Sequence, residues 1–410
     1  MNKTYKFFSY LRIILYGLWR RQTKSHYKEQ SKKILVIMDQ VGVGDAICSL
    51  DAFYNLALHV QEEYELYIAV QPSVIHFLKE SKSTFGVHVI SLDLSREVKF
   101  TFSVFKENQH KLDAHHWYYI VSLNRIGNYM KLLLMGCHYD KMLGMEYIEQ
   151  KHSLLEKFFE KQLEKYYCIY LHDTMHIMQV YTMIFKEFLH ILTNEQKKVN
   201  YRFYQIPVLG KNPLQSIAGK YSIVCPSIAA QPDHPFAFRK WPIERIVEIV
   251  DFILESSSLS VCLCGVEADM IDNEYVESHV KDSSRIINMT GKTSFKEWIE
   301  LIRGAKFVLG NDSGYIHLAS YLGVQSFVLA GYWNYGRFLP YGNDYIENRS
   351  IPVNIRIPMV SCAGCSHRNV PCNLKKQCDM LIEREGVYKC IWDIDVKQVE
   401  NQLLQSGVLS

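Results

Sequence analysis

The sequence predicts an α/β protein of two domains, each built around a parallel sheet. Short apolar runs bounded by turn residues, such as 33–38 and 221–225, are typical of strands that are buried on both faces. Segments with helical spacing alternate with these runs, which is the order that crossover helices produce. The chain has 410 residues, nearly half of them hydrophobic, and this length is enough for two such domains.

In the first half, strands and helices alternate and end in a long helical stretch. The expected strands are residues 33–38, 66–70, 87–92 and 118–123. The expected helices are residues 46–57, 129–135 and, less sharply bounded, 172–192. This alternation indicates a parallel sheet whose strands are joined by helices.

The alternation stops at residues 206–213, a stretch with two prolines that we interpret as a linker, and it restarts at 221–225. A helix is expected to begin at Pro242, because proline suits the first turn of a helix. The further strands expected in this half are residues 261–264, 307–309 and 326–329. The further helices are expected at residues 268–280 and 294–303.

These boundaries divide the chain into five parts. They are a basic amphipathic segment (1–30), a first Rossmann-like domain (31–205), a linker (206–218), a second Rossmann-like domain (219–395) and a tail helix (396–410). Neither a repeat beyond the two α/β halves nor a low-complexity segment is evident in the sequence.

Positive charge is concentrated at the amino terminus. Residues 1–33 carry nine Lys or Arg and one Glu, a net charge of +8, which leaves −5 for the rest because the whole chain carries +3. An acidic body argues against nucleic acid as a partner.

The same segment contains an apolar run that Arg12 and Gly17 interrupt. The run is about 13 residues long, shorter than the ~20 needed to span a bilayer, and no small-residue cleavage site follows it. An apolar stretch flanked by Lys and Arg suits a helix that lies in an anionic membrane surface. A helix packed on the protein itself is the alternative. On the first interpretation, the protein is cytoplasmic and peripheral on the inner face of the cytoplasmic membrane.

The segment 308–324 is the most informative part of the sequence. It reads as a buried strand, a tight turn of Gly, Asn, Asp and Ser, and then a helix. The backbone N–H groups and the partial positive charge at such a helix start suit a phosphate or diphosphate. Asp312 and His317 add an acceptor and a donor beside the turn. The simpler alternative is an ordinary capped helix, because Asn, Asp and Ser are common caps.

A comparable turn, containing Gly44 and Asp45, follows the strand 33–38. Ligands of α/β sheets bind outside the carboxyl ends of the strands. We therefore expect Gly44 and Asp45 in one domain and residues 311–314 in the other to face a central cleft. This organisation fits an enzyme that joins two substrates, one bound by each domain.

Five of the eleven cysteines are crowded near the carboxyl terminus. They are Cys362, Cys365, Cys372, Cys378 and Cys390. In a reduced compartment, such a cluster favours a metal site over a disulfide framework. The CxxC spacing of the first two cysteines lets two thiolates bind one ion, so a structural zinc or iron held by four of the five is expected. Unliganded thiols are the alternative.

Four segments of the chain match a known family. They are residues 34–37 with 44–46, residues 239–242 with Glu244 and Arg245, residues 310–324 with Gly331 and 340–342, and residues 390–394. On these segments the chain resembles the lipopolysaccharide heptosyltransferases of glycosyltransferase family 9, which have the two-domain GT-B fold. The third segment is the most specific match.

The resemblance implies an inverting transfer of a heptose from ADP-heptose to a sugar acceptor, with no metal in the chemistry. Asp45 would be the general base that takes the proton of the acceptor hydroxyl, and helix capping is the alternative role. The N–H groups around Ser313, Gly314 and Tyr315 would stabilise the departing diphosphate. A cation from the neighbouring segment 239–240 would assist them.

Which cation binds phosphate is left open, because Arg239 stands where the family usually has Lys and Lys240 follows it. The other donor-side candidates are Ser227, Glu267, Asp312 and His317. Glu267 matches an acidic position near the ribose or adenine, or it is an ordinary carboxylate in a first helical turn. The stretch between Ser227 and Arg239 is longer than the family's usual loop, which puts the donor preference in doubt.

On the acceptor side, Gly44, Arg125 and Asn128 are the candidates. Arg125 and Asn128 follow the fourth expected strand, where an anionic acceptor could bind, and a solvated loop is the alternative. The acceptor is expected to be a lipid-linked glycan, such as the lipopolysaccharide core. Two further hypotheses are a protein O-heptosyltransferase of surface proteins and a non-catalytic GT-B protein that only binds a nucleotide sugar.

Overall fold

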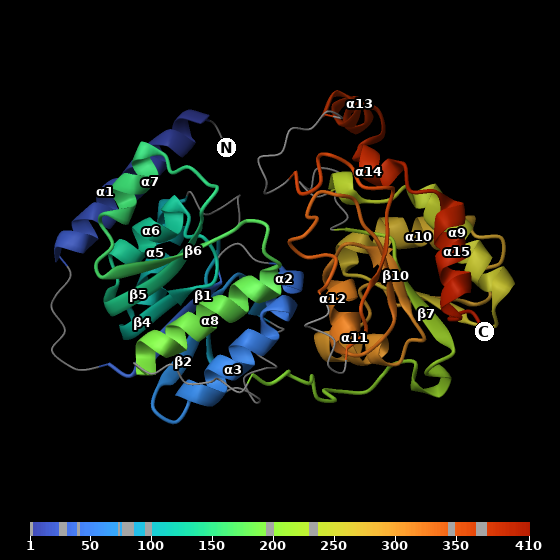
Figure 1. The fold of residues 1–410 in the computed structure, drawn as a ribbon, viewed down its shortest axis with the longest axis horizontal. Coiled ribbons are helices and arrows are strands. Elements are labelled where there is room, and N and C mark those ends of the chain that lie inside the picture. Colours follow the sequence, from blue (N-terminus) through green and yellow to red (C-terminus); the bar gives the residue numbers. More distant parts are fainter. Residues whose placement is uncertain are drawn as a thin grey trace. The chain divides into compact units, whose positions relative to one another are not determined.

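A computed structural model describes residues 3–23, 31–38, 42–72, 74–75, 86–94, 101–193, 201–228, 237–342, 349–365 and 375–410. The chain forms two compact units, Met1–Tyr204 and Gln205–Ser410. Each unit contains a six-stranded sheet in which every neighbouring pair of strands is parallel (Figure 1). The α/β, GT-B architecture expected from the sequence is therefore confirmed.

The first sheet has the strand order β3-β2-β1-β4-β5-β6. Its strands are β1 (Lys33–Met38), β2 (Glu65–Val70), β3 (His88–Ser91), β4 (His116–Ser122), β5 (His138–Tyr147) and β6 (Tyr166–Leu171). The helices of this unit are α1 (Lys3–Thr23), α2 (Val43–Cys48), α3 (Leu50–Val60), α5 (Phe102–Asp113), α6 (Asn128–Met135), α7 (Leu154–Glu160) and α8 (Ile177–Thr193).

The second sheet has the order β12-β11-β10-β7-β8-β9. Its strands are β7 (Tyr221–Cys225), β8 (Ser260–Leu263), β9 (Ile286–Asn288), β10 (Val308–Asn311), β11 (Ser326–Leu329) and β12 (Val353–Ile355). Its helices are α9 (Ile243–Ser256), α10 (Met270–His279), α11 (Phe295–Arg303), α12 (Gly314–Tyr321), α13 (Lys375–Glu385), α14 (Lys389–Trp392) and α15 (Val396–Ser406), with short 3-10 turns η1 (Gln215–Ile217), η2 (Ala237–Arg239) and η3 (Glu267–Asp269).

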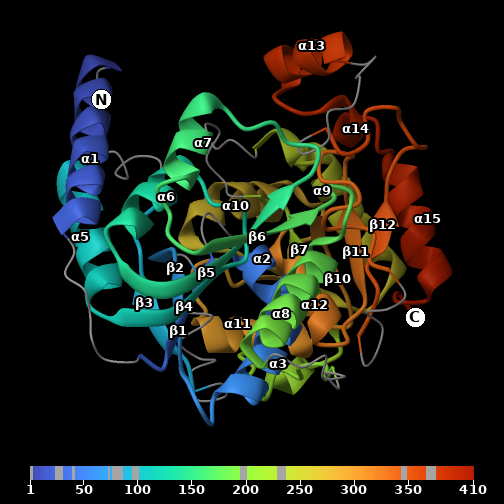
Figure 2. The ribbon, with the colours of Figure 1, turned by 60° about the vertical axis from the view of Figure 1, so that its left-hand side comes forward.

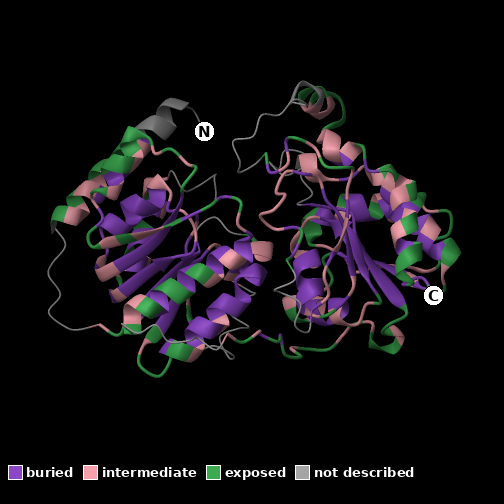
Figure 3. Cartoon of the chain, in the orientation of Figure 1, coloured by how far each residue is buried: buried purple, intermediate pink, exposed green. Residues whose placement is uncertain are grey.

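The strands form the cores of both units, as Figure 3 shows by their burial. Leu35 and Ile37 of β1 pack with Phe105 and Leu112 of α5 in one core. In the second unit, Val224 of β7 packs with residues of α9 and α15. Apolar side chains on both faces of a parallel strand are needed because helices cover both faces.

The structure corrects several boundaries. The expected helix 46–57 is two helices, α2 and α3, separated at Ser49, whose hydroxyl donates to the Ala46 carbonyl at 2.8 Å. Such local bonds compete with the helical ladder. The long helix α8 begins at Ile177 and not at residue 172.

Four strands were not expected from the sequence: β5, β6, β9 and β12. The sheet order places β6, β9 and β12 at sheet edges, and β9 and β12 have only three residues each. Strand β5 carries polar residues among its apolar ones, so it lacks the continuous apolar run by which the other strands were predicted.

Helix α1 lies on the first unit against α5 and α6 (Figure 2). Ile13 is fully buried, and a Cβ added at Gly17 would lie 3.3 Å from the Leu132 carbonyl oxygen. The face of α1 that carries Ile13 and Gly17 therefore packs on the protein, which was the alternative to a helix lying in the membrane surface. In the part of the chain that the structure describes, no helix has the length and hydropathy needed to cross a bilayer.

Candidate active site

The turn after β10 is fixed by the buried side chain of Asn311. Its amide nitrogen donates to the Pro226 carbonyl at 2.7 Å, and its amide oxygen accepts from the Trp241 N–H at 2.9 Å. The Trp241 indole N–H donates to the Ile394 carbonyl at 3.1 Å. Asn311 therefore holds the ends of β7 and β10 and the segment before α9 together at the carboxyl edge of the sheet.

Helix α12 begins directly after this turn. Ser313 is its N-cap with an extended backbone, and its side chain makes no capping bond. The buried Ser313 hydroxyl has no hydrogen-bond partner among the described residues. The first N–H groups of a helix also lack intrahelical acceptors. Within the described part of the chain, the turn thus presents the Ser313 hydroxyl and the first N–H groups of α12 as donors that the helix itself does not use.

Asp312 lies among groups that can carry positive charge. Its carboxylate is 3.7 Å from an Arg239 guanidinium nitrogen and 3.9 Å from Nε2 of His317. His317 is buried, and its Nδ1 lies 2.5 Å from the Tyr341 hydroxyl. Burial lowers the pKa of His317, although the Asp312 charge acts in the opposite direction. The imidazole of His317 is therefore neutral near pH 7. Of the two groups beside Asp312, Arg239 is the one that carries positive charge.

Lys240 points to a different partner. Its ammonium lies 2.8 and 3.0 Å from the two carboxylate oxygens of Asp272, on α10. The Ser227 hydroxyl donates to the same carboxylate. The charge of Lys240 is thus balanced by Asp272, whereas Arg239 lies beside the turn. The sequence offered no signal for Asp272, because it is on a helix remote in sequence from both partners.

Glu267 is exposed at the start of η3, in the segment that follows β8. This position at the carboxyl edge of the sheet is compatible with both roles considered for it, a donor contact and a first-turn carboxylate. Residues 229–236, most of the unusually long stretch between Ser227 and Arg239, lie outside the described residues.

Asp45 lies in the first turn of α2, just beyond the carboxyl end of β1. One of its carboxylate oxygens accepts from the Gly42 N–H at 3.0 Å, so the residue does cap the helix. Gly42 is exposed, and Gly44 and Asp45 are partly exposed. A carboxylate that caps a helix retains further lone pairs for a second partner.

The acceptor-side candidate Arg125 lies at the carboxyl edge of the first sheet, after β4. Its guanidinium contacts Glu146 at 2.6 Å and Glu156 at 2.8 Å. Burial lowers the pKa of Arg125, but these two ion pairs outweigh burial and raise it. Arg125 is thus held by carboxylates and is not a solvated loop residue. The buried amide oxygen of Asn128 has no hydrogen-bond partner among the described residues.

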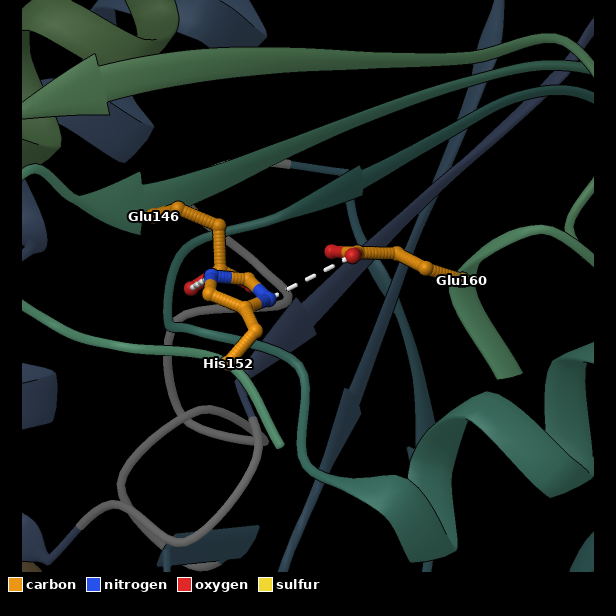
Figure 4. A group of neighbouring side chains, drawn as sticks. All are labelled: Glu146, His152 and Glu160. Atoms are coloured by element: carbon orange, nitrogen blue, oxygen red, sulfur yellow. Dashed lines mark ion pairs between the residues drawn. The ribbon is translucent and has the colours of Figure 1, made fainter. Parts of the chain in front are cut away.

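Glu146 belongs to a larger ionic cluster (Figure 4). The two ring nitrogens of His152 face Glu146 and Glu160, each at 3.3 Å. The fully buried Lys131 lies 3.5 Å from Glu160. Among the described residues, this is the one group of three whose potential metal-ligating atoms all lie within 4.8 Å of one another. Arg125 and Lys131 already form ion pairs with Glu146 and Glu160, so a metal ion would compete with these two cations for the carboxylates.

Four of the five clustered cysteines lie within the described residues, and Cys372 does not. Cys390 accepts from the Tyr332 N–H at 3.2 Å, and burial raises its pKa to about 11. Cys378 and Cys365 act in the same direction on this pKa, but no three of the described cysteine sulfurs form a group within 4.8 Å of one another. Cys362 is buried and Cys365 is exposed.

Two Rossmann-like parallel sheets, one in each unit, are the architecture of the GT-B glycosyltransferase fold. Residues 132–356, more than half of the chain, match glycosyltransferase family 9 (heptosyltransferase), and the chain belongs to this family. Its resemblance to the family, inferred above from four segments, is thereby confirmed.

Individual relatives are distant. The chain is 27% identical over 86 residues to the lipooligosaccharide heptosyltransferase 2 of Haemophilus ducreyi, a match that spans 24% of that protein and 20% of this chain.

Two solved structures share the fold at 15% identity. A family 9 glycosyl transferase from Veillonella parvula superposes with a TM-score of 0.65, covering 94% of this chain and 99% of that one. The ADP-heptose lps heptosyltransferase II of E. coli gives a TM-score of 0.60, with 92% and 98% covered.

Proposed function

We propose that this protein is an inverting glycosyltransferase that moves a heptose from ADP-heptose to a lipopolysaccharide-core or related surface-glycan acceptor. The observation that carries the proposal is the turn at Asp312, with free donors and Arg239 beside it, in a chain of family 9. The names of the relatives, a lipooligosaccharide heptosyltransferase and an ADP-heptose-dependent enzyme, support the choice of sugar and acceptor.

In the proposed reaction, the acceptor oxygen attacks the anomeric carbon while the bond from that carbon to the diphosphate oxygen breaks. Asp45 takes the proton of the acceptor hydroxyl. The leaving diphosphate gains negative charge, which the N–H groups at the start of α12 and the Arg239 guanidinium stabilise. These protein groups provide both the base and the electrophilic assistance, so no metal is assigned to the chemistry.

The proposed acceptor is linked to lipid, which suits an enzyme held at the inner membrane surface. Leu11, Leu15 and Trp19 are spaced by four residues and are 40%, 59% and 53% exposed on α1. Residues at this spacing share one face of a helix. The positive charge of residues 1–33 would attract anionic lipid to this apolar face.

The cysteine cluster is proposed to hold one structural zinc or iron ion. Cys365, Cys378 and Cys390 are ligand candidates within the described residues. The N–H donated to the Cys390 sulfur favours its thiolate, against the larger effect of burial. Cys362 and Cys372 are the remaining ligand candidates. A closed set of thiolates would pin the segment around α13 to the second domain and would take no part in the transfer.

The experiment that tests the function combines purified protein and ADP-heptose with one of two acceptors, heptose-deficient lipopolysaccharide or surface protein, and uses buffer without acceptor as the blank. ADP release together with a glycan heavier by one heptosyl unit is the expected result. Modification of the protein acceptor alone would favour a protein O-heptosyltransferase. ADP-heptose binding without transfer to any acceptor in a cell-envelope extract would overturn the catalytic proposal.

A further inference from the structure

A second arginine lies in line with the Asp312 turn across the second sheet. The register pairs Asn311 of β10 with Leu329 of β11, and Leu329 with Ile355 of β12. Asp312 and Arg356 each follow the last residue of this row, so they leave the sheet at the same edge. Neighbouring strands are about 4.8 Å apart, and an arginine side chain can reach across the one intervening strand.

The Arg356 guanidinium is partly buried and, within the described part of the chain, is not paired with an acid. It lies 4.8 Å from the centre of the Tyr335 ring and 5.7 Å from that of Tyr332, and it donates to the Asn354 side chain at 2.6 Å. Among the described residues, its buried Nε has no hydrogen-bond partner, and no carboxylate forms an ion pair with it within 4.0 Å. A guanidinium has five N–H donors, so most of its donor capacity is unused.

The backbone of Arg356 is fixed independently of this side chain, because Gln398 donates to its carbonyl at 2.6 Å. Burial lowers the pKa of Arg356, and Asp312 is among the groups that act against this lowering. The Asp312 carboxylate thus favours the charged form of Arg356, although the two side chains do not form a direct ion pair.

The charges at this edge are therefore unequal. Arg239 lies 3.7 Å from Asp312, Arg356 leaves the sheet in the same register row as Asp312, and burial disfavours the charged form of His317. Two guanidinium groups and one carboxylate thus leave the sheet along this row. The buried Ser313 hydroxyl adds a further unused donor. An anion bound at the start of α12 would compensate this excess positive charge.

We propose that Arg356 is a donor-binding residue, a second guanidinium that contacts the diphosphate of the nucleotide sugar beside Arg239. The inference rests on the proposed function in the choice of ligand, a nucleoside diphosphate. In the reaction, Arg356 hydrogen-bonds the leaving diphosphate as its negative charge develops. Charge-assisted contacts of planar guanidinium groups with phosphate are stronger than neutral hydrogen bonds.

The test is calorimetric binding of ADP, AMP and inorganic pyrophosphate to the full chain and to Arg356→Gln and Arg356→Lys. Arg356→Gln should weaken ADP and pyrophosphate binding about tenfold or more, with little effect on AMP. Arg356→Lys, which keeps the charge, should retain part of the affinity. A purely structural role would lower the thermal midpoint and leave the ratio of ADP to AMP affinity unchanged.

Arg349→Gln is the matched control. Arg349 is a buried arginine of the same domain that stacks 3.7 Å from the Tyr321 ring, at the far end of α12 from the turn. It should leave the ADP to AMP ratio unchanged. Equal ADP affinity in the wild type and both folded Arg356 variants would overturn the inference and leave the function standing. If the wild type binds pyrophosphate but no adenine nucleotide, the proposed ADP-linked donor is wrong. The pyrophosphate affinities of the wild type and the Arg356 variants then test the role of Arg356 by themselves. A wild type that binds none of these probes contradicts both.

Discussion

The Arg239 guanidinium lies 3.7 Å from the Asp312 carboxylate, and the two residues come from turns that precede α9 and α12. Neighbouring Lys240 faces away from this pair toward Asp272. Adjacent basic residues in the sequence thus have separate partners. On the proposed function, Arg239 is therefore the cation expected to contact phosphate, whereas Lys240 supports α10 through Asp272.

Arg239→Gln should weaken ADP binding about tenfold or more, because a charge-assisted hydrogen bond is lost. Lys240→Met should mainly lower the thermal midpoint, since it leaves the largely buried Asp272 carboxylate without its ion-pair partner. The double variant Lys240→Met with Asp272→Asn is the control and should recover stability and bind ADP nearly as the wild type does. A larger loss of ADP affinity in the stable double variant than in Arg239→Gln would contradict the assignment.

Asp45→Asn should abolish transfer while leaving ADP affinity unchanged. A positioned base contributes on the order of 100- to 10,000-fold to the rate, and asparagine cannot accept the proton. Its amide oxygen can still accept from the Gly42 N–H, so the start of α2 should stay folded. The measurement is initial rate beside ADP calorimetry and circular dichroism. Turnover at the wild-type rate in a folded variant would exclude Asp45 as the base.

Stability should decrease as the pH falls below about 6.5, the ordinary pKa of histidine. Burial lowers the pKa of His317 in the folded protein, so the unfolded chain binds a proton that folded His317 resists. The unfolding free energy therefore rises with pH in this window, by up to about 1.4 kcal/mol per pH unit for one such group. His317→Gln should make the dependence shallower.

Denaturant unfolding at several pH values measures this effect. Tyr341 and Asp312, the groups that face His317, are kept in the variant. His115, whose pKa burial also lowers, is present in both proteins and cancels in the comparison. Replacement of the exposed His279 is the matched control and should leave the slope unchanged. Identical slopes for the wild type and His317→Gln would contradict the prediction.

Leu15→Gln with Trp19→Gln should reduce sedimentation with anionic vesicles at low salt. Each exposed apolar side chain contributes about 1.5–3 kcal/mol if it becomes fully buried, and the electrostatic part weakens as salt rises. Leu404→Gln, at a 55% exposed position on α15, is the matched control. Unchanged sedimentation of the double variant would contradict the assigned face.

Deletion of residues 1–21 would be a poorer test of membrane binding than these substitutions. Ile13 is fully buried and Gly17 contacts Leu132, so removing α1 should expose part of the first core and lower the thermal midpoint. The substitutions above change only the exposed face of the helix and avoid this effect.

Elemental analysis of protein purified without added metal should find near one zinc or iron per chain. Cys365→Ser should remove the ion and lower the thermal midpoint, because metal affinity is coupled to folding. Cys262→Ser, at a buried core cysteine outside the cluster, is the control and should retain the metal. Less than about a tenth of an ion per chain, with all thiols free to react, would rule the site out.

The sequence predicted the strands that bury both faces and the turns at their ends. The bounds predicted for β1, β7 and β11 agree with the observed ones. A strand covered by helices on both faces must be continuously apolar, so the apolar run itself marks where the strand begins and ends. The Asp312 turn could be predicted for a related reason, since a buried strand followed by Asn, Asp, Ser and Gly has few other local solutions.

Only the tertiary structure decided which charged groups meet. Lys240 and Asp272 are 32 residues apart, and Arg125 and Glu146 are 21 apart, on elements that no local pattern connects. Arg356 follows a three-residue edge strand, which leaves too short a pattern to predict. Apolar burial produces a periodic pattern in the sequence, which can be recognised before the fold is known. An ion pair depends on the distance between two side chains, and this distance is set only when the sheet register brings their backbones together.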